Sequence, residues 1–96
     1  QSFSIPVDAF GTLSGTIQPH SYLIATVNDG RLWLMSNADG KGAYTDDRTT
    51  HLQLEGLASE PSWSVIEGSA DADWTNGILN LQLQNQEGAT EVIVSP

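Results

Sequence analysis

The chain has 96 residues, of which 39% are hydrophobic, and twelve acidic against three basic side chains give a net charge of −9. This length suits a single domain over residues 1–96, and the charge disfavours binding to nucleic acid or to anionic membrane surfaces. The absence of cysteine excludes disulfides and cysteine-ligated zinc, which fits a cytoplasmic location. Because the chain begins at Gln1, we expect an N-terminal arm to be absent or removed.

Apolar and polar residues alternate with a period of two along most of the chain, which predicts β-strands rather than helices. The first predicted strand contains Phe3, Ile5 and Val7. Pro6 lies inside it and predicts an edge position, because proline cannot donate a ladder hydrogen bond. A short second strand over residues 13–18 follows.

The next two predicted strands, residues 22–27 and 31–36, form a hairpin. Asp29-Gly30 lies between them, and both residues tolerate the positive φ angles of a tight turn. Residues 37–49 are rich in glycine, aspartate and basic side chains, which is typical of a long solvated loop.

The second half of the chain begins with a predicted strand over residues 51–57, and Trp63, Val65 and Ile66 then cover one end of the core. Asn76-Gly77 predicts a second tight hairpin, which ends in an alternating leucine strand over residues 78–83. A last strand spans residues 91–94. The series predicts an all-β sandwich or small barrel built of antiparallel hairpins.

The most specific pattern is ADWTNGIL, from Ala72 to Leu79. Its alanine, Asn-Gly pair, isoleucine and leucine resemble the α-crystallin domain of the small heat-shock protein family, as does the order of the upstream strands and turns. The chain departs from the family pattern at Ala9-Phe10-Gly11, where the family has Leu-Pro-Gly, and at residues 49–52, where it lacks the family arginines. It would therefore be a divergent member.

This resemblance implies an antiparallel immunoglobulin-like β-sandwich of seven to eight strands. It also implies an ATP-independent chaperone domain of the stress response, a homodimer that binds unfolded client proteins without catalysis or cofactor. The family binds clients in a groove between two strands. One wall would be Tyr22, Ile24 and Thr26, or Leu23, Ala25 and Val27 if the register shifts by one residue. The other wall would be Ala70, Ala72 and Trp74.

Two intersubunit features follow from the same resemblance. Ala43, Tyr44 and Thr45 correspond to a dimerisation strand, although they are equally compatible with a solvated loop. Val92 and Val94 resemble a C-terminal tail that docks on a neighbouring subunit, although they also fit the last strand of the chain's own sandwich.

The alternatives to a chaperone of this family are a monomeric p23-like co-chaperone and a non-catalytic structural β-module of a virion or of the extracellular space. An enzyme is not expected. Asp71 and Asp73 lack the glycine and glutamate of a calcium loop, and His20 and His51 are too far apart in the sequence for a zinc motif. We therefore expect no metal site.

Overall fold

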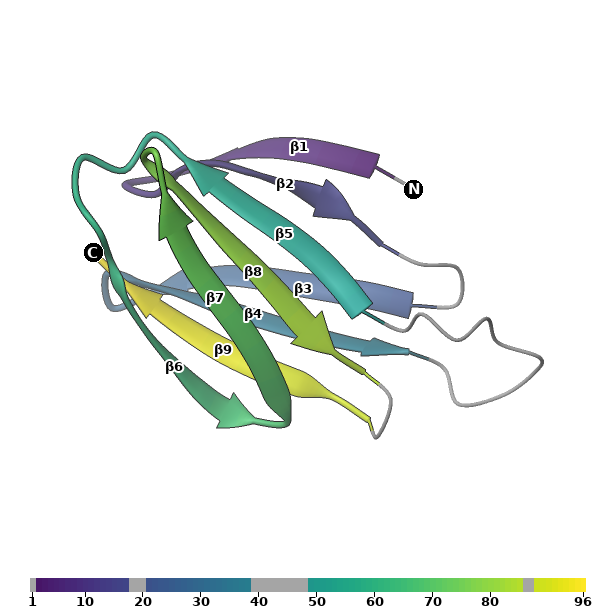
Figure 1. Cartoon of the computed structure of the whole chain (residues 1–96). Helices are drawn as coiled ribbons and strands as arrows, with labels where there is room; N and C mark the ends of the chain where they lie inside the picture. Colours follow the sequence, from purple (N-terminus) through teal and green to yellow (C-terminus); the bar gives the residue numbers. More distant parts are fainter. Residues whose placement is uncertain (1, 18–20, 39–48, 86–87) are drawn as a thin grey trace.

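The computed structural model describes residues 2–17, 21–38, 49–85 and 88–96, which form nine strands and no helix (Figure 1). The strands build two antiparallel sheets that lie face to face, so the predicted all-β sandwich is confirmed. The strands are β1 (Ser2–Val7), β2 (Gly11–Thr16), β3 (Ser21–Asn28), β4 (Arg31–Ala38), β5 (Thr49–Glu55), β6 (Ser62–Glu67), β7 (Ser69–Thr75), β8 (Ile78–Gln84) and β9 (Thr90–Ser95).

The five-stranded sheet, sheet A, has the order β1-β2-β5-β8-β7, and the four-stranded sheet, sheet B, has the order β3-β4-β9-β6. Sheet A contains the hairpins β1–β2 and β7–β8 with β5 between them, and sheet B contains the hairpin β3–β4 together with β9 and β6. Thus β5 lies between β2 and β8, and β9 lies between β4 and β6. The edges of the sandwich are β1 and β7 in sheet A and β3 and β6 in sheet B. The edge position that Pro6 predicted for β1 is confirmed.

Both predicted tight hairpins are present. Asp29 and Gly30 have φ angles of 53° and 70°, and Asn76 and Gly77 have φ angles of 54° and 79°. Two successive positive φ values are those of a type I′ turn, whose twist matches that of the flanking strands. The β3–β4 and β7–β8 hairpins therefore form where the sequence places them.

The described residues contain more strands than the seven to eight expected, and β6 is the strand that sequence patterning did not separate. Its apolar residues Val65 and Ile66 are consecutive, so they show no alternation. The reason is a shift in the pairing of β6 with β9 between Val65 and Glu67, which is the mark of a β-bulge.

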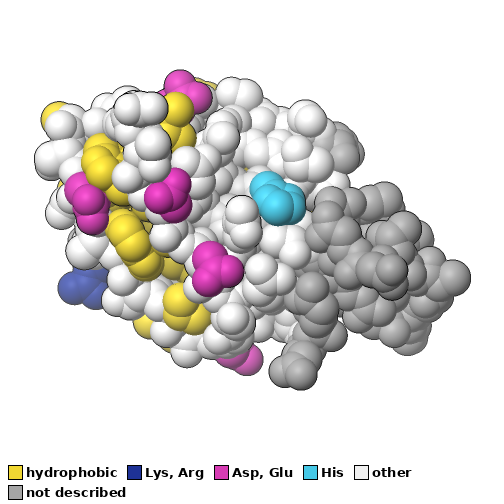
Figure 2. Space-filling model, in the orientation of Figure 1, with side chains coloured by type: hydrophobic (Ala, Val, Ile, Leu, Met, Phe, Trp, Pro, Cys, Tyr) yellow, Lys and Arg dark blue, Asp and Glu magenta, His cyan; other side chains and the backbone are white. Residues whose placement is uncertain are grey.

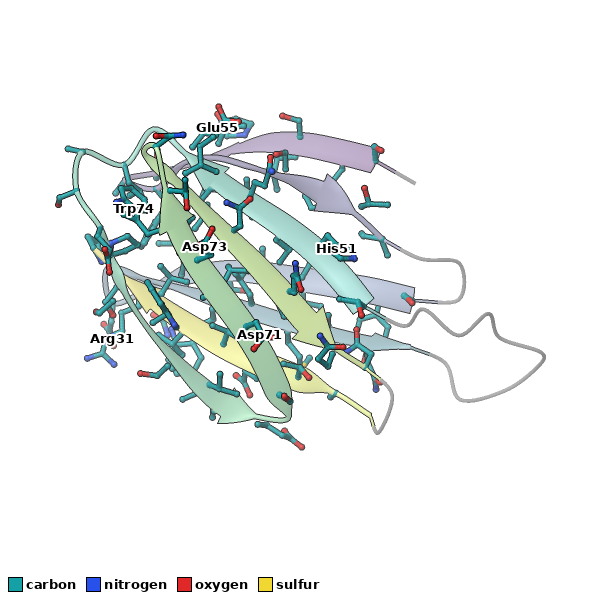
Figure 3. The ribbon with its side chains drawn as sticks, viewed as in Figure 1. Arg31, His51, Glu55, Asp71, Asp73 and Trp74 are labelled. Atoms are coloured by element: carbon teal, nitrogen blue, oxygen red, sulfur yellow. The ribbon has the colours of Figure 1, made fainter. Side chains whose placement is uncertain are left out.

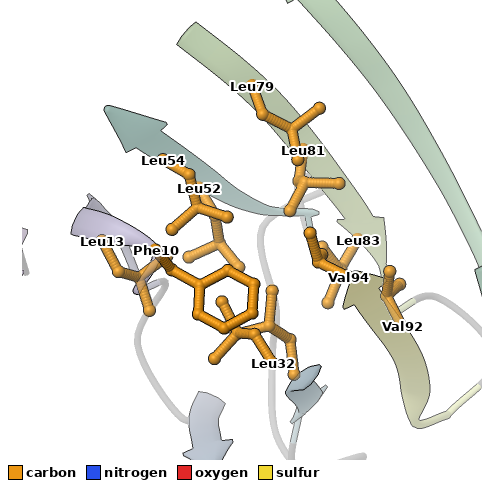
Figure 4. Packing of buried hydrophobic residues seen from close by; sticks show 11 residues of the cluster. Phe10, Leu13, Leu32, Leu52, Leu54, Leu79, Leu81, Leu83, Val92 and Val94 are labelled. Carbon is orange, nitrogen blue, oxygen red and sulfur yellow. The ribbon is translucent and has the colours of Figure 1, made fainter. Parts of the chain in front are cut away.

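The core lies between the two sheets and is made of leucine, valine and one phenylalanine (Figure 4). Phe10 enters it from the turn between β1 and β2, whereas the other residues come from strands. The alternating leucines of β8 point inward, as predicted. The buried cluster consists of Phe10, Leu13, Leu32, Leu34, Leu52, Leu54, Leu79, Leu81, Leu83, Val92 and Val94.

A buried polar cluster centred on Asn85 lies beyond the end of β8. The Asn85 side chain is 1% exposed, and its Nδ2 donates to the carbonyl oxygen of Ser36 at 3.1 Å and to that of Gly88 at 3.3 Å. Its Oδ1 accepts a hydrogen bond from Thr50 Oγ1 at 3.0 Å and lies 3.2 Å from Ser36 Oγ. One side chain therefore joins β4, β5 and the segment before β9.

Replacing Gly11 with alanine should destabilise the fold by about 2 to 3 kcal/mol, because Gly11 has a φ angle of +79° and lies against β5. A Cβ atom there would lie 1.9 Å from the carbonyl oxygen of Glu55. The matched control is Gly30→Ala, since Gly30 has a φ angle of +70° and a Cβ atom added to it would meet no neighbouring atom within 4 Å. Equal losses in free energy of unfolding from urea titration would show that the β2–β5 contact is unimportant.

Candidate functional site

The first predicted wall of the client groove lies on the outside of the sandwich. Tyr22, Ile24 and Thr26 pair with outward-facing residues of β4, and their side chains point away from sheet A. Leu23, the residue between the first two, packs against the core. Since side chains alternate along a strand, the three predicted residues cannot face the interior.

The second predicted wall faces inward at the opposite edge of the sandwich. Ala70, Ala72 and Trp74 lie on β7, which is the edge of sheet A farthest from β1, and all three pack against the core. One wall therefore points outward from sheet B while the other points inward from sheet A. The groove predicted from these six residues is wrong, because β3 and β7 lie at opposite edges of the sandwich and their predicted side chains face different ways.

The alternative register places Leu23, Ala25 and Val27 on the inner side of β3, where they pair with Ser36, Leu34 and Leu32. Ala25 and Val27 line a hollow there together with residues of β1. A hollow between the two edge strands is lined by Ile5, Val7, Ala25 and Val27, with Leu32 among its residues. We call this hollow, defined by Ile5, Val7, Ala25 and Val27, the β1–β3 groove.

The β1–β3 groove is apolar and accessible. Ile5 and Val27 are 43% and 44% exposed although they pair with fully buried leucines, Leu13 and Leu32. Partial exposure of inward-facing residues means that the two sheets do not close over the core along this side. An apolar segment placed here would remove both side chains from water.

Backbone edges flank the groove on both sides. Within the described residues, β1 and β3 each have a strand neighbour on one side only. An unpaired strand edge offers N–H and C=O groups to a further strand, except at Pro6 of β1, which has no N–H. The edge over residues 22–27 of β3 contains no proline, so β3 is the better template for an added strand.

The opposite side of the sandwich, between β6 and β7, is lined by two tryptophans. Trp63 and Trp74 lie on these two edge strands and pack against the core. Only Gly68 separates β6 from β7, so the chain itself passes from one sheet to the other along this side. The β1–β3 groove has no such large aromatic side chains and is lined by Ile5, Val7, Ala25 and Val27.

The two intersubunit predictions have different outcomes. Val92 and Val94 are fully buried in β9, which lies between β4 and β6. They are core residues of their own sandwich, so the prediction of a free docking tail is wrong. Ala43, Tyr44 and Thr45 lie outside the described residues, and the predicted dimerisation strand stays a prediction.

The outer face of sheet A is polar (Figure 3). His51, Asp71 and Asp73 lie on it, and the acidic side chains in view are scattered singly over the surface (Figure 2). Side chains on the outer face of sheet A form hydrogen bonds with one another, such as the bond that Gln53 Nε2 donates to Asn80 Oδ1 at 3.0 Å. In the part of the chain that the structure describes, no group of three His, Cys, Asp or Glu residues is placed to hold a metal ion.

The described residues also include no helix long and apolar enough to cross a membrane. Comparisons with models of protein families, with curated proteins and with solved structures found no match. The resemblance to the small heat-shock proteins therefore stays a prediction from the ADWTNGIL pattern and the order of the strands.

Proposed function

We propose that the chain binds extended apolar segments of partly unfolded proteins in the β1–β3 groove, and that it does so without ATP or chemistry. The observation that carries the proposal is the pair of half-exposed, inward-facing side chains Ile5 and Val27 between two unpaired strand edges. Such an arrangement offers hydrogen bonds to a backbone and an apolar surface to alternate side chains.

Strand addition explains why the binding would be broad rather than specific. The backbone hydrogen bonds at the edge of β3 are independent of the sequence that is bound. Burial of one large apolar side chain contributes at most about 1.5 to 3 kcal/mol, so a few alternate apolar residues suffice for weak binding. Partly unfolded proteins expose such segments, whereas folded proteins bury them.

The net charge of −9 fits this activity in two ways. It keeps the chain and its complexes soluble, because molecules of like charge repel one another. It also disfavours acidic segments, so neutral or basic apolar segments should bind best. Asp8 lines the groove and is exposed, so its carboxylate also disfavours acidic segments.

Suppression of aggregation of a heat-denatured model protein, without ATP, tests the proposal directly. We expect light scattering by the denatured protein to decrease as the ratio of chain to denatured protein increases. An unrelated folded acidic protein of similar size is the control and should have no effect. Scattering that is unchanged by an excess of folded chain would exclude the activity and favour a structural β-module.

A further inference from the structure

The outer face of sheet B is apolar. Cross-strand pairing places Thr26, Trp33 and Ile93 in one row, and Ile24 and Met35 together in the next. Ile24 is 49% exposed, more than any residue of the core cluster. The corresponding face of sheet A carries mostly hydroxyl, amide and carboxylate side chains. We call the set Tyr22, Ile24, Trp33, Met35 and Ile93 the apolar face of sheet B.

Arg31 and Glu91 lie on either side of the centre of this face, and Glu67 of β6 pairs with Glu91. Arg31 precedes Trp33 by two residues on β4, and Glu91 precedes Ile93 by two residues on β9. The two strands are antiparallel and Trp33 pairs with Ile93. Arg31 and Glu91 therefore lie at opposite ends of the face, and the Trp33–Ile93 pair marks the midpoint between them.

The indole of Trp33 adds a second observation on the same row. Its Nε1 atom is buried, and no hydrogen-bond acceptor for it is found among the described residues. A buried donor without an acceptor costs about 1 to 3 kcal/mol. The indole N–H at the centre of the apolar face is therefore unpaired among the described residues.

We propose that a second copy of this chain covers the apolar face of sheet B. The two-fold axis of this dimer lies in the plane of the interface. It crosses β4 and β9 beside Trp33 and Ile93, so that the two apolar faces pack against each other. The same axis places Arg31 of each copy over Glu91 of the other, so the dimer contains two Arg31–Glu91 pairs. An interface in which each copy offers the same patch is the usual arrangement of homodimers.

The area of the face predicts a weak, reversible dimer. Even the whole outer face of sheet B, with four strands about 4.8 Å apart and about seven residues that each rise about 3.3 Å, covers roughly 15 by 23 Å. This is less than half of the approximately 800 Å² that each partner buries in a standard interface. The net charge of −9 on each copy opposes association, so added salt should strengthen the dimer by screening this repulsion.

Sedimentation of the whole chain over a wide concentration range tests the proposal. We expect a monomer–dimer equilibrium, and Ile24→Asp should weaken the dimer at least about tenfold because it places a carboxylate in an apolar interface. The matched control is Ile78→Asp on the outer face of sheet A, where Ile78 pairs with Glu55 and Thr75. This control should leave the dimer unchanged.

A charge exchange tests the two-fold arrangement. Arg31→Glu should weaken the dimer at least about tenfold, because two carboxylates would then face each other. The double variant Arg31→Glu with Glu91→Arg has the original net charge and should restore association. Restored association would require that Arg31 and Glu91 pair across the interface. If the two residues only stabilised the fold of one copy, exchanging them would not restore the dimer.

Several results would overturn the proposal. One is a monomer at every concentration, and another is equal weakening of the dimer by Ile24→Asp and Ile78→Asp. A third is loss of the dimer in Tyr44→Asp while the dimer of Ile24→Asp stays intact. The dimer does not depend on segment binding, since the β1–β3 groove and the apolar face lie on opposite sides of β3. Failure of either proposal therefore leaves the other standing.

Discussion

Replacing Asn85 with alanine should lower the free energy of unfolding by about 3 to 5 kcal/mol. The substitution removes the acceptor of Thr50 Oγ1 and the donor to the carbonyl oxygens of Ser36 and Gly88. Thr50 and Ser36 are themselves buried, so water cannot replace the lost hydrogen bonds without opening the end of the sandwich. Chemical denaturation of the purified variant measures the loss.

The matched control for Asn85 is Asn80→Ala. Asn80 is also an asparagine of the β8 region, and its side chain accepts one exposed hydrogen bond, from Gln53 Nε2. Because water can satisfy exposed groups, this variant should lose no more than about 1 kcal/mol. A similar loss in the two variants would contradict the central role of Asn85 in joining β4, β5 and the segment before β9.

Replacing Val27 with aspartate should weaken suppression of aggregation at least about tenfold, since a bound apolar segment would then bury an unpaired carboxylate. Val27 is 44% exposed, so the variant should remain folded, which its thermal unfolding curve can verify. The readout is the amount of chain required to halve the light scattering of the denatured model protein.

Val65→Asp is the matched control for Val27→Asp. Val65 is also a valine, is 42% exposed, and faces inward at the other edge of sheet B, on β6. The two variants have the same net charge, so a difference between them reports where the segment binds. Equal activity of the two variants, or a selective loss in Val65→Asp, would contradict binding in the β1–β3 groove.

Local signals predicted most strands of this fold because each has a direct physical cause. The Asp29-Gly30 and Asn76-Gly77 turns adopt the positive φ angles for which those residues are suited. Pro6 placed β1 at an edge because of its missing N–H. β6 was not predicted as a strand of its own, because a bulge between Val65 and Glu67 removes the alternation on which strand prediction depends.

The candidate site was harder to predict because it depends on non-local pairing. Tyr22, Leu23, Ile24 and Ala25 are consecutive and apolar or aromatic, so alternation does not reveal which side of β3 faces the core. The partner of β3 across the groove is β1 rather than β7, which follows from the strand order of both sheets. The structural role of Asn85 could likewise not be predicted, because its hydrogen-bond partners lie on β4 and β5, far away in the sequence.

Amide hydrogen exchange with a bound peptide tests segment binding in the β1–β3 groove most directly. The experiment compares the free chain with the chain saturated by an extended, neutral apolar peptide, and it follows each backbone amide by NMR. Binding in this groove predicts slower exchange along β3 and β1, at amides that have no strand partner in the free chain, and little change in β6 and β7. Measurable peptide binding with protection at β6 and β7, or on the apolar face of sheet B alone, would contradict binding in the β1–β3 groove.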